Sequence, residues 1–246
     1  MSFSDAEVER YARHLVLAEI GGPGQQRLKA ASVAIVGAGG VGCPAALYLT
    51  AAGVGRLTLI DDDHVALSNL QRQVLFETGD IDQPKASTAV RRLASLNPHV
   101  EVRPLDRRLT AHTAADMLTG HDLVLDGTDS FETRLAVSDA CVSLGLPLVS
   151  AALGRWTCQV GVFEARPCYR CLTPAPPPGA ETCARVGVVG ALAGVAGSLA
   201  ALEAIKLITG TGEPLTGRLL IFDGLQGASR TVRVQADPDC PACGHA

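Results

Sequence analysis

Apolar and polar positions along the first 150 residues form blocks that predict strands followed by helices. Short apolar runs predict buried strands at Ser32–Val36, Arg56–Ile60, Val100–Pro104, Leu123–Asp126 and Leu146–Ala151. Helices are predicted between them, over Val41–Ala52, Pro84–Leu96 and Phe131–Leu144. Strands that alternate with helices predict an α/β fold with a Rossmann-like, mostly parallel sheet and helices on both faces.

The two ends of the chain follow other patterns. Ser4-Asp5-Ala6-Glu7 is a capping box and predicts a helix over Asp5–Ala18, which the run Gly21–Gly24 should end. No helical or strand period runs through 64–83. Beyond Gly154 we expect antiparallel strands that extend the sheet, at Trp156–Phe163, Arg218–Phe222 and Ser229–Val234. A loop rich in Pro, Gly and Cys is predicted over Arg166–Arg185, exposed at Pro174–Gly179.

One stretch resembles a membrane span. Gly187–Leu202 is small or apolar throughout except at Ser198, and Glu203 follows it directly. It falls short of the roughly 20 apolar residues that a bilayer needs, so we expect a buried core or dimer helix and no membrane partner. The polar, acidic start of the chain lacks the pattern of a signal peptide. We therefore expect a cytoplasmic protein.

Composition narrows the function classes only slightly. The chain is 47% apolar and 19% charged, as in ordinary soluble proteins, and its net charge is −4. No basic stripe with interleaved aromatic residues is present, which argues against nucleic acid as the main partner. Eight cysteines without a secretory signal favour metal or thiol chemistry over a disulfide framework.

A glycine-rich loop stands between a predicted strand and a predicted helix. The glycines Gly37, Gly39, Gly40 and Gly42 allow a tight turn and a close backbone approach to a phosphate, which the helix N-terminus also favours. Asp61 ends the next strand, where a carboxylate can accept hydrogen bonds from ribose hydroxyls. The motif predicts nucleotide binding, but it suits NAD as well as ATP.

Charged residues after the strands favour a triphosphate with Mg²⁺. Arg72, Lys85 and Asp129 all follow strands whose carboxyl ends should meet beside the glycine loop. Each residue also has a simpler interpretation. Lys85 could be a solvated helix-start lysine, Arg72 half of a surface ion pair, and Asp129 the N-cap of the helix that begins near Phe131.

Two C-x-x-C pairs, Cys168/Cys171 and Cys240/Cys243, match tetrahedral zinc held only by protein ligands. A redox dithiol is the alternative. Such a zinc would tie the C-terminal tail to the mid-chain loop, and it has no catalytic part. Cys183, near Arg185, is a candidate reactive thiol or an incidental loop cysteine. The remaining cysteines, Cys43, Cys141 and Cys158, are predicted to be packed as small apolar residues.

In this order, the glycine loop, Ser68-Asn69-Leu70-Gln71-Arg72, Lys85, Asp129 and both cysteine pairs resemble the ThiF/MoeB/HesA family, bacterial relatives of ubiquitin-activating E1 enzymes. The resemblance covers nearly the whole chain and includes Asp61-Asp62-Asp63, Cys168-Tyr169-Arg170-Cys171 and Glu203-Ala204-Ile205-Lys206. Asp80-Ile81-Asp82 and Val188-Val189-Gly190 resemble the thiamine branch more than the molybdopterin branch.

The resemblance implies an adenylyltransferase. ATP and Mg²⁺ would bind the glycine loop and the residues Asp61, Asp63, Ser68, Asn69, Leu70, Gln71, Arg72, Lys85, Asp129 and Ser130, with Asp129 as the magnesium ligand. Arg13 would reach the nucleotide of the neighbouring subunit in a homodimer. The substrate would be a small ubiquitin-like sulfur-carrier protein ending in Gly-Gly, whose carboxylate attacks the α-phosphate and releases pyrophosphate.

The same resemblance divides the single domain, residues 1–246, into a helical segment (1–31), a nucleotide-binding core (32–153) and a carrier-binding, zinc-clipped part (154–246). Two places depart from the family pattern. Most relatives have Asp-Cys-Thr-Asp-Asn where this chain has Asp126-Gly127-Thr128-Asp129-Ser130, and the proline-rich loop Thr173–Cys183 weakens the transfer of a thiol role to Cys183.

Two other functions compete with this hypothesis. The glycine loop alone would suit an NAD-dependent oxidoreductase, although no acid or base for hydride transfer is evident. A zinc-clipped scaffold could also bind a carrier without activating it. The sequence does not identify the carrier or the sulfur donor, nor whether Cys183 forms a covalent intermediate.

Overall fold

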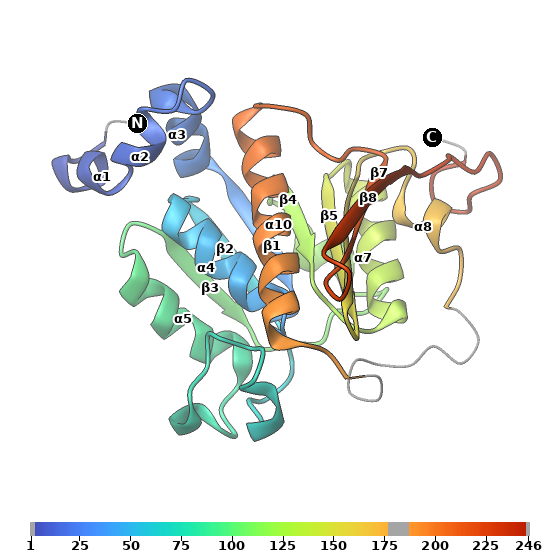
Figure 1. Cartoon of the computed structure of the whole chain (residues 1–246), viewed down its shortest axis with the longest axis horizontal. Helices are drawn as coiled ribbons and strands as arrows, with labels where there is room; N and C mark the ends of the chain where they lie inside the picture. The colour runs from blue at the N-terminus through green and yellow to red at the C-terminus, as the bar shows by residue number, and fades with distance from the viewer. Residues whose placement is uncertain (1–2, 177–186, 245–246) are drawn as a thin grey trace.

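One eight-stranded sheet organises the part of the chain that the computed structural model describes, residues 3–176 and 187–244 (Figure 1). Its order is β3-β2-β1-β4-β5-β6-β7-β8. The strands are β1 (Ser32–Val36), β2 (Arg56–Ile60), β3 (Glu101–Leu105), β4 (Leu123–Asp126), β5 (Leu148–Gly154), β6 (Thr157–Phe163), β7 (Arg218–Asp223) and β8 (Ala228–Arg233). The first five strands in this order are parallel, and β6, β7 and β8 add antiparallel pairs. The predicted mostly parallel sheet with an antiparallel extension is confirmed.

Helices cover both faces because successive residues of a strand point to opposite sides. Val33 and Ile35 of β1 belong to the core shared with α4 (Gly42–Ala52), α5 (Lys85–Leu96) and α10 (Gly190–Thr209). Ala34 and Val36 belong to the second core, which packs against α6 (Ala114–Leu118) and α7 (Phe131–Leu144). A strand buried on both faces needs an unbroken apolar run, and Ser32–Val36 is fully buried.

The N-terminal prediction needs two corrections. The predicted helix Asp5–Ala18 is divided into α1 (Asp5–Arg10) and α2 (Ala12–Leu15), because Tyr11 leaves helical geometry. The Tyr11 side chain is buried and its hydroxyl accepts a hydrogen bond from Asn97. The run Gly21–Gly24 does not stop helix formation but begins α3 (Gly21–Ala30), since a proline is tolerated in the first turn of a helix.

Short elements that carry little periodicity were missing from the prediction. The aperiodic stretch 64–83 contains the 3₁₀ turns η1 (Leu67–Asn69) and η2 (Thr78–Asp80). The helix α8 (Tyr169–Leu172) lies inside the predicted loop Arg166–Arg185, and α6 also went unpredicted. Residues 174–176 are exposed as expected, and the rest of the stretch predicted to be exposed, 177–179, lies outside the described residues.

The long apolar helix is α10, the one helix among the described residues that is long and apolar enough to cross a bilayer. It packs along α4 and against β5, β6 and α3. Gly197 makes this close packing possible, because a side-chain Cβ there would lie 2.4 Å from the Val41 carbonyl oxygen. One side of α10 is therefore core, in agreement with the predicted core helix.

The strand order reverses between β1 and β4, which places two loops side by side. A Cβ on Gly37, after β1, would lie 3.2 Å from the backbone of Gly127, after β4. In open α/β sheets ligands bind at this point, outside the carboxyl ends of the strands.

Candidate nucleotide site and zinc site

The glycine loop is held in shape by backbone hydrogen bonds. Gly37 adopts a φ of 91°, a region that favours glycine, and its N–H donates to the Ile60 carbonyl at 2.8 Å. The Ala38 N–H donates to Asp61 Oδ2 at 2.7 Å, and the Asp63 N–H donates to Asp61 Oδ1 at 2.9 Å. Asp61 thus fixes the loop, and each oxygen keeps a lone pair for a ribose hydroxyl. Burial raises the pKa of Asp61, although nearby Lys85 opposes the shift.

Arg72 lies across the glycine loop. Its Cγ and Cδ would be 3.4 Å from a Cβ on Gly40, and its Nη1 donates to the Ser68 carbonyl at 3.0 Å. Arg72 has no ion pair with any residue that the structure describes, so the interpretation as a surface ion pair is wrong.

Lys85 is buried rather than solvated, with 6% of its side chain exposed. Its ammonium donates to Asp63 Oδ2 at 2.9 Å, while Asp63 itself is mostly exposed. The simple interpretation of a solvated helix-start lysine is therefore also wrong. Asp63 holds a desolvated cation at the edge of the site.

Asp129 is not the N-cap of α7. The cap is Ser130, whose Oγ accepts a hydrogen bond from the Thr133 N–H. The exposed Asp129 carboxylate has no hydrogen bond or ion pair to the residues described, and it borders the same cavity as Asp61 and Lys85. Carboxylate oxygens that line a phosphate-sized cavity are suitable ligands for Mg²⁺.

A single cavity of about 780 Å³ joins these groups at the carboxyl ends of the strands. The predicted residues that line it are Gly37, Gly39, Gly40, Asp61, Asp63, Asn69, Arg72, Lys85, Asp129 and Ser130. Gly42, Ser68, Leu70 and Gln71 do not line it. Gly42 begins α4 beneath the loop, and Gln71 packs against Gly190 of α10 instead.

Arg13 lies far from this cavity within its own chain. Helix α2 contacts α3 through a 2.9 Å hydrogen bond between His14 and Gln25, and Gly24 of α3 packs at Thr209, the last residue of α10. Gln71, next to Arg72, packs at the first residue of α10. The 20 residues of α10 span about 30 Å between these two contacts. Helix α2, which carries Arg13, lies near the end of α10 that packs on α3 (Figure 1), and Arg13 does not line the cavity. Cys183 lies outside the described residues.

Several polar residues of the site were not predicted from the sequence. Gln73, Arg107, Arg108, Thr128 and Arg134 line the cavity. Gln73 is buried, and its Oε1 has no hydrogen-bond partner among the described residues. Its position in the polar run Gln71-Arg72-Gln73 was a usable signal. Arg107 and Arg108 follow β3, the edge strand of the parallel part, and their adjacency after a strand was the signal.

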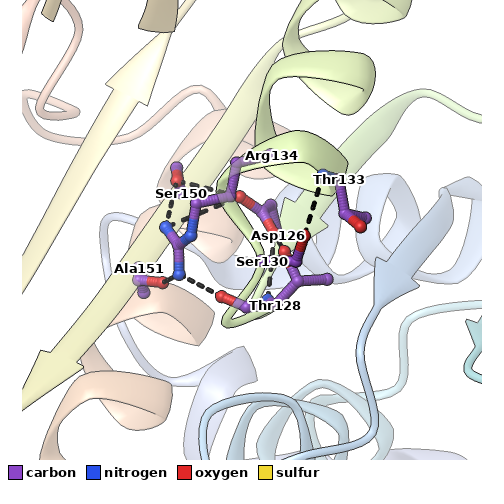
Figure 2. A network of polar contacts seen from close by, with 7 residues as sticks. All are labelled: Asp126, Thr128, Ser130, Thr133, Arg134, Ser150 and Ala151. Atoms are coloured by element: carbon purple, nitrogen blue, oxygen red, sulfur yellow. Dashed lines mark hydrogen bonds and ion pairs between the residues drawn. The ribbon is translucent and has the colours of Figure 1, made fainter. Parts of the chain in front are cut away.

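Arg134 belongs to a buried network beneath the Asp129 loop (Figure 2). Its guanidinium donates to the carbonyls of Thr128 and Ala151, the second at 2.8 Å, and lies 3.7 Å from Asp126 Oδ2. Asp126 also accepts from the N–H and hydroxyl of Thr128, at 3.0 and 2.7 Å. No sequence motif predicts this pairing, because Asp126 and Arg134 belong to different elements.

The four predicted zinc ligands come together although the pairs are about 70 residues apart. The sulfur atoms of Cys168, Cys171, Cys240 and Cys243 all lie within 4.8 Å of one another. Cys168 and Cys240 sulfurs are 3.6 Å apart, and Cys171 and Cys243 sulfurs are 3.4 Å apart. Tetrahedral zinc with Zn–S bonds of about 2.3 Å requires sulfurs about 3.8 Å apart, so the cluster fits zinc.

The zinc cluster is also linked to the rest of the fold. Burial opposes ionisation of Cys240, but backbone N–H groups of Cys243 and Ala242 outweigh it and lower its pKa to about 7. Arg170, between the first two ligands, pairs with Asp139 of α7 through two bonds of 2.6 and 2.7 Å. The tail after β8 is thereby fastened to α7.

The other described cysteines are buried as predicted. Burial raises the pKa of the Cys43 thiol to about 12 and that of Cys158 to about 11, and it also raises the pKa of Cys141. These thiols are inert packing groups.

Comparison with known proteins agrees with this geometry. The model of the ThiF family matches residues 11–242. The chain is 47% identical to a sulfur carrier protein adenylyltransferase of Thermus thermophilus, over 99% of this chain and 93% of that protein. It is 43% identical to the SAMP-activating enzyme E1 of Haloferax volcanii, over 99% and 92% of the two chains.

Longer relatives and solved structures extend the comparison. Bovine adenylyltransferase and sulfurtransferase MOCS3 is 50% identical over 99% of this chain, which spans about half of that protein (54%). Among solved structures, Escherichia coli MccB superposes with a TM-score of 0.85 at 25% identity, over 96% of this chain and 72% of that one.

Proposed function

The chain belongs to the ThiF family, and from that premise we propose that it adenylylates the C-terminal carboxylate of a small ubiquitin-like sulfur-carrier protein with ATP. The observation that carries the proposal is the cavity, which places the glycine loop, the cations of Arg72 and Lys85, and an Asp129 carboxylate without a partner among the described residues around one space. The Thermus thermophilus relative, similar over nearly its whole length, is named for this activity.

The reaction needs electrostatic stabilisation rather than a base. The carrier carboxylate is already an anion; its oxygen forms a bond to the α-phosphorus, the bond to the bridging oxygen breaks, and pyrophosphate leaves with the electron pair. Repulsion between the two anions opposes this attack. Arg72 and the desolvated Lys85 offset it, because preorganised charges act strongly in a site shielded from water. Mg²⁺, held by Asp129, would neutralise phosphate charge.

Pyrophosphate exchange into ATP tests the proposal. With purified protein, Mg²⁺ and a Gly-Gly-ended carrier, labelled pyrophosphate should enter ATP. Arg72→Ala or Lys85→Ala should lower the exchange rate about 100-fold or more. Arg92→Ala, an exposed arginine of α5 that does not line the cavity, is the matched control.

Two outcomes would favour the competing functions. Tight binding of NADH without binding of ATP would support an oxidoreductase. Normal cellular function of the Arg72→Ala and Lys85→Ala variants would support a carrier-binding scaffold. We propose the thiamine-pathway carrier as the cognate one, and a side-by-side exchange assay with the thiamine and molybdopterin carriers decides between the two branches.

We also propose a homodimer in which Arg13 completes the partner's site. Two observations support it. Arg13 does not line the cavity of its own chain, and the outer surface of α4 and α10 exposes Tyr48, Val195 and Leu202. Arg13→Ala and Asp129→Ala should each be inactive. A mixture of the two should regain about a quarter of wild-type exchange, because half the dimers carry one intact site. No recovery in verified heterodimers would contradict the shared site.

We also propose a structural zinc ion and a cytoplasmic location for this protein. Zinc would be held by the four-cysteine cluster as a structural ion, since four protein ligands leave no open position. We place the protein in the cytoplasm, because thiols that bind zinc need a reducing compartment.

A further inference from the structure

Arg134 lies in a buried network of polar contacts, and its place in the lining of the cavity does not explain this network. Its side chain is 6% exposed and that of Asp126 is 1% exposed, so both charges are removed from water. Figure 2 shows the guanidinium reaching from α7 to the end of β4 and the middle of β5. A buried pair of this kind contributes little net stability compared with apolar packing. The role of the pair is therefore to fix the positions of the residues that it contacts.

The geometry that it fixes is that of the loop bearing Asp129. Thr128 is held from both sides: its N–H and hydroxyl donate to Asp126, and its carbonyl accepts from Arg134. Ser150 donates its hydroxyl to Asp126 Oδ2 at 3.1 Å and accepts from Arg134 at 3.3 Å, which closes the network. The residue after Thr128 is Asp129, whose carboxylate has no partner among the described residues.

The helix fixes the other side of Asp129. Ser130 caps α7, and the Arg134 N–H donates to the Ser130 carbonyl at 3.0 Å. Asp129, whose carboxylate has no partner among the described residues, thus lies between two residues held by hydrogen bonds. These contacts hold its backbone at the edge of the cavity.

We propose that Arg134 is a positioning residue that directs the Asp129 carboxylate at the divalent cation of the bound nucleotide. This inference rests on the proposed function, because it takes Asp129 as the cation ligand. Arginine suits the task since its planar fork donates in fixed directions to carbonyls of two segments. Lysine is a point charge on a flexible stem and cannot hold both carbonyls in one geometry.

The test is a double-mutant cycle on nucleotide binding without carrier. ATP affinity is measured with and without Mg²⁺ for wild type, Arg134→Lys, Asp129→Asn and the double variant. Arg134→Lys should raise the half-saturating Mg²⁺ concentration about 10-fold or more, as loss of an outer-shell partner does. Its ATP affinity without Mg²⁺ should not change. In the Asp129→Asn background, Arg134→Lys should add nothing.

Three results would overturn the inference. In the first, the fold-changes in Mg²⁺ requirement caused by Arg134→Lys and Asp129→Asn multiply in the double variant, which means that the two residues act independently. In the second, Arg134→Lys weakens ATP binding equally with and without Mg²⁺, which indicates direct contact with the nucleotide. The third is an unchanged Mg²⁺ requirement. If wild type shows no Mg²⁺-dependent ATP binding, or Asp129→Asn has no effect, the proposed function fails and the inference with it.

A second variant guards against loss of folding. Asp126→Asn combined with Arg134→Gln removes both buried charges together, which avoids leaving one unpaired. Thermal unfolding and circular dichroism check its integrity. It should raise the Mg²⁺ requirement in the same way, and a folded pair with a wild-type requirement would refute the positioning role.

Discussion

The substitution Gly42→Ala tests whether close backbone contacts within the glycine loop hold the loop in its conformation without a ligand. A Cβ at position 42 would lie 1.8 Å from the Gly37 carbonyl oxygen, so that carbonyl must move by about 1.6 Å to reach an ordinary 3.4 Å contact. The move pulls on two hydrogen bonds, from the Gly37 N–H to Ile60 and from the Ala38 N–H to Asp61.

The expected cost follows from those two bonds. A neutral backbone bond contributes about 1 kcal/mol and a bond to a carboxylate about 2 kcal/mol, so the loss is about 3 kcal/mol. For a domain of this size each kcal/mol lowers the melting temperature by about 2–4 °C. Gly42→Ala should therefore melt about 6–12 °C below wild type.

Gly39→Ala is the matched control in the same loop. A Cβ there meets only Gln73 Nε2, at 3.9 Å, so folding should be unaffected. The methyl group would instead enter the cavity, where a phosphate approaches the backbone. Gly39→Ala should melt within about 1 °C of wild type and bind ATP more weakly.

Differential scanning calorimetry and ATP titration measure the two effects. A Gly42→Ala protein that melts within 2 °C of wild type would refute the steric reasoning. Equal destabilisation of both variants would show that the loop tolerates no side chain anywhere, and that the distances have no predictive value.

Three further predictions concern other sites. Gln73→Leu should leave the free energy of unfolding unchanged or raise it, since it removes a buried oxygen that has no partner in the described part of the chain. ATP binding, measured by titration, should weaken about tenfold, and an unchanged affinity would remove Gln73 from the site. Lys29 and the Ser4 N–H lower the pKa of Glu7 to about 2. The stability that the Glu7 charge contributes should thus be present above pH 4.5 and disappear as the pH falls toward 2, so urea unfolding of Glu7→Gln and wild type should converge over that range. Cys168→Ser should lose the zinc and melt earlier, whereas Cys141→Ala, a buried thiol outside the cluster, should keep about one zinc per chain by metal analysis.

Elements with strong local signals were predictable. The strands Ser32–Val36, Arg56–Ile60 and Leu123–Asp126 and the helix Phe131–Leu144 agree with the structure at both ends. Each is a run buried against both neighbouring layers or a capped helix, so the pattern of apolar residues already specified it. The elements that failed were short or depended on one tertiary contact, as α1 and α2 do on the buried Tyr11.

Most of the candidate site was also predictable, because glycines, carboxylates and cations at strand ends have few other reasons to occur together. The simple interpretations of Lys85 and Arg72 could be discarded only with coordinates. Burial of Lys85 and its pairing with Asp63 are properties of the assembled site, not of either residue.

The sequence by itself determined the parallel sheet, the glycine loop between β1 and α4, and the two cysteine pairs that come together, since each follows from a local pattern of side chains. The tertiary structure alone decided that Arg134 supports the Asp129 loop and that Arg13 does not line the cavity of its own chain. Both facts depend on which elements become neighbours, and that is set by packing across the sheet rather than by any run of adjacent residues.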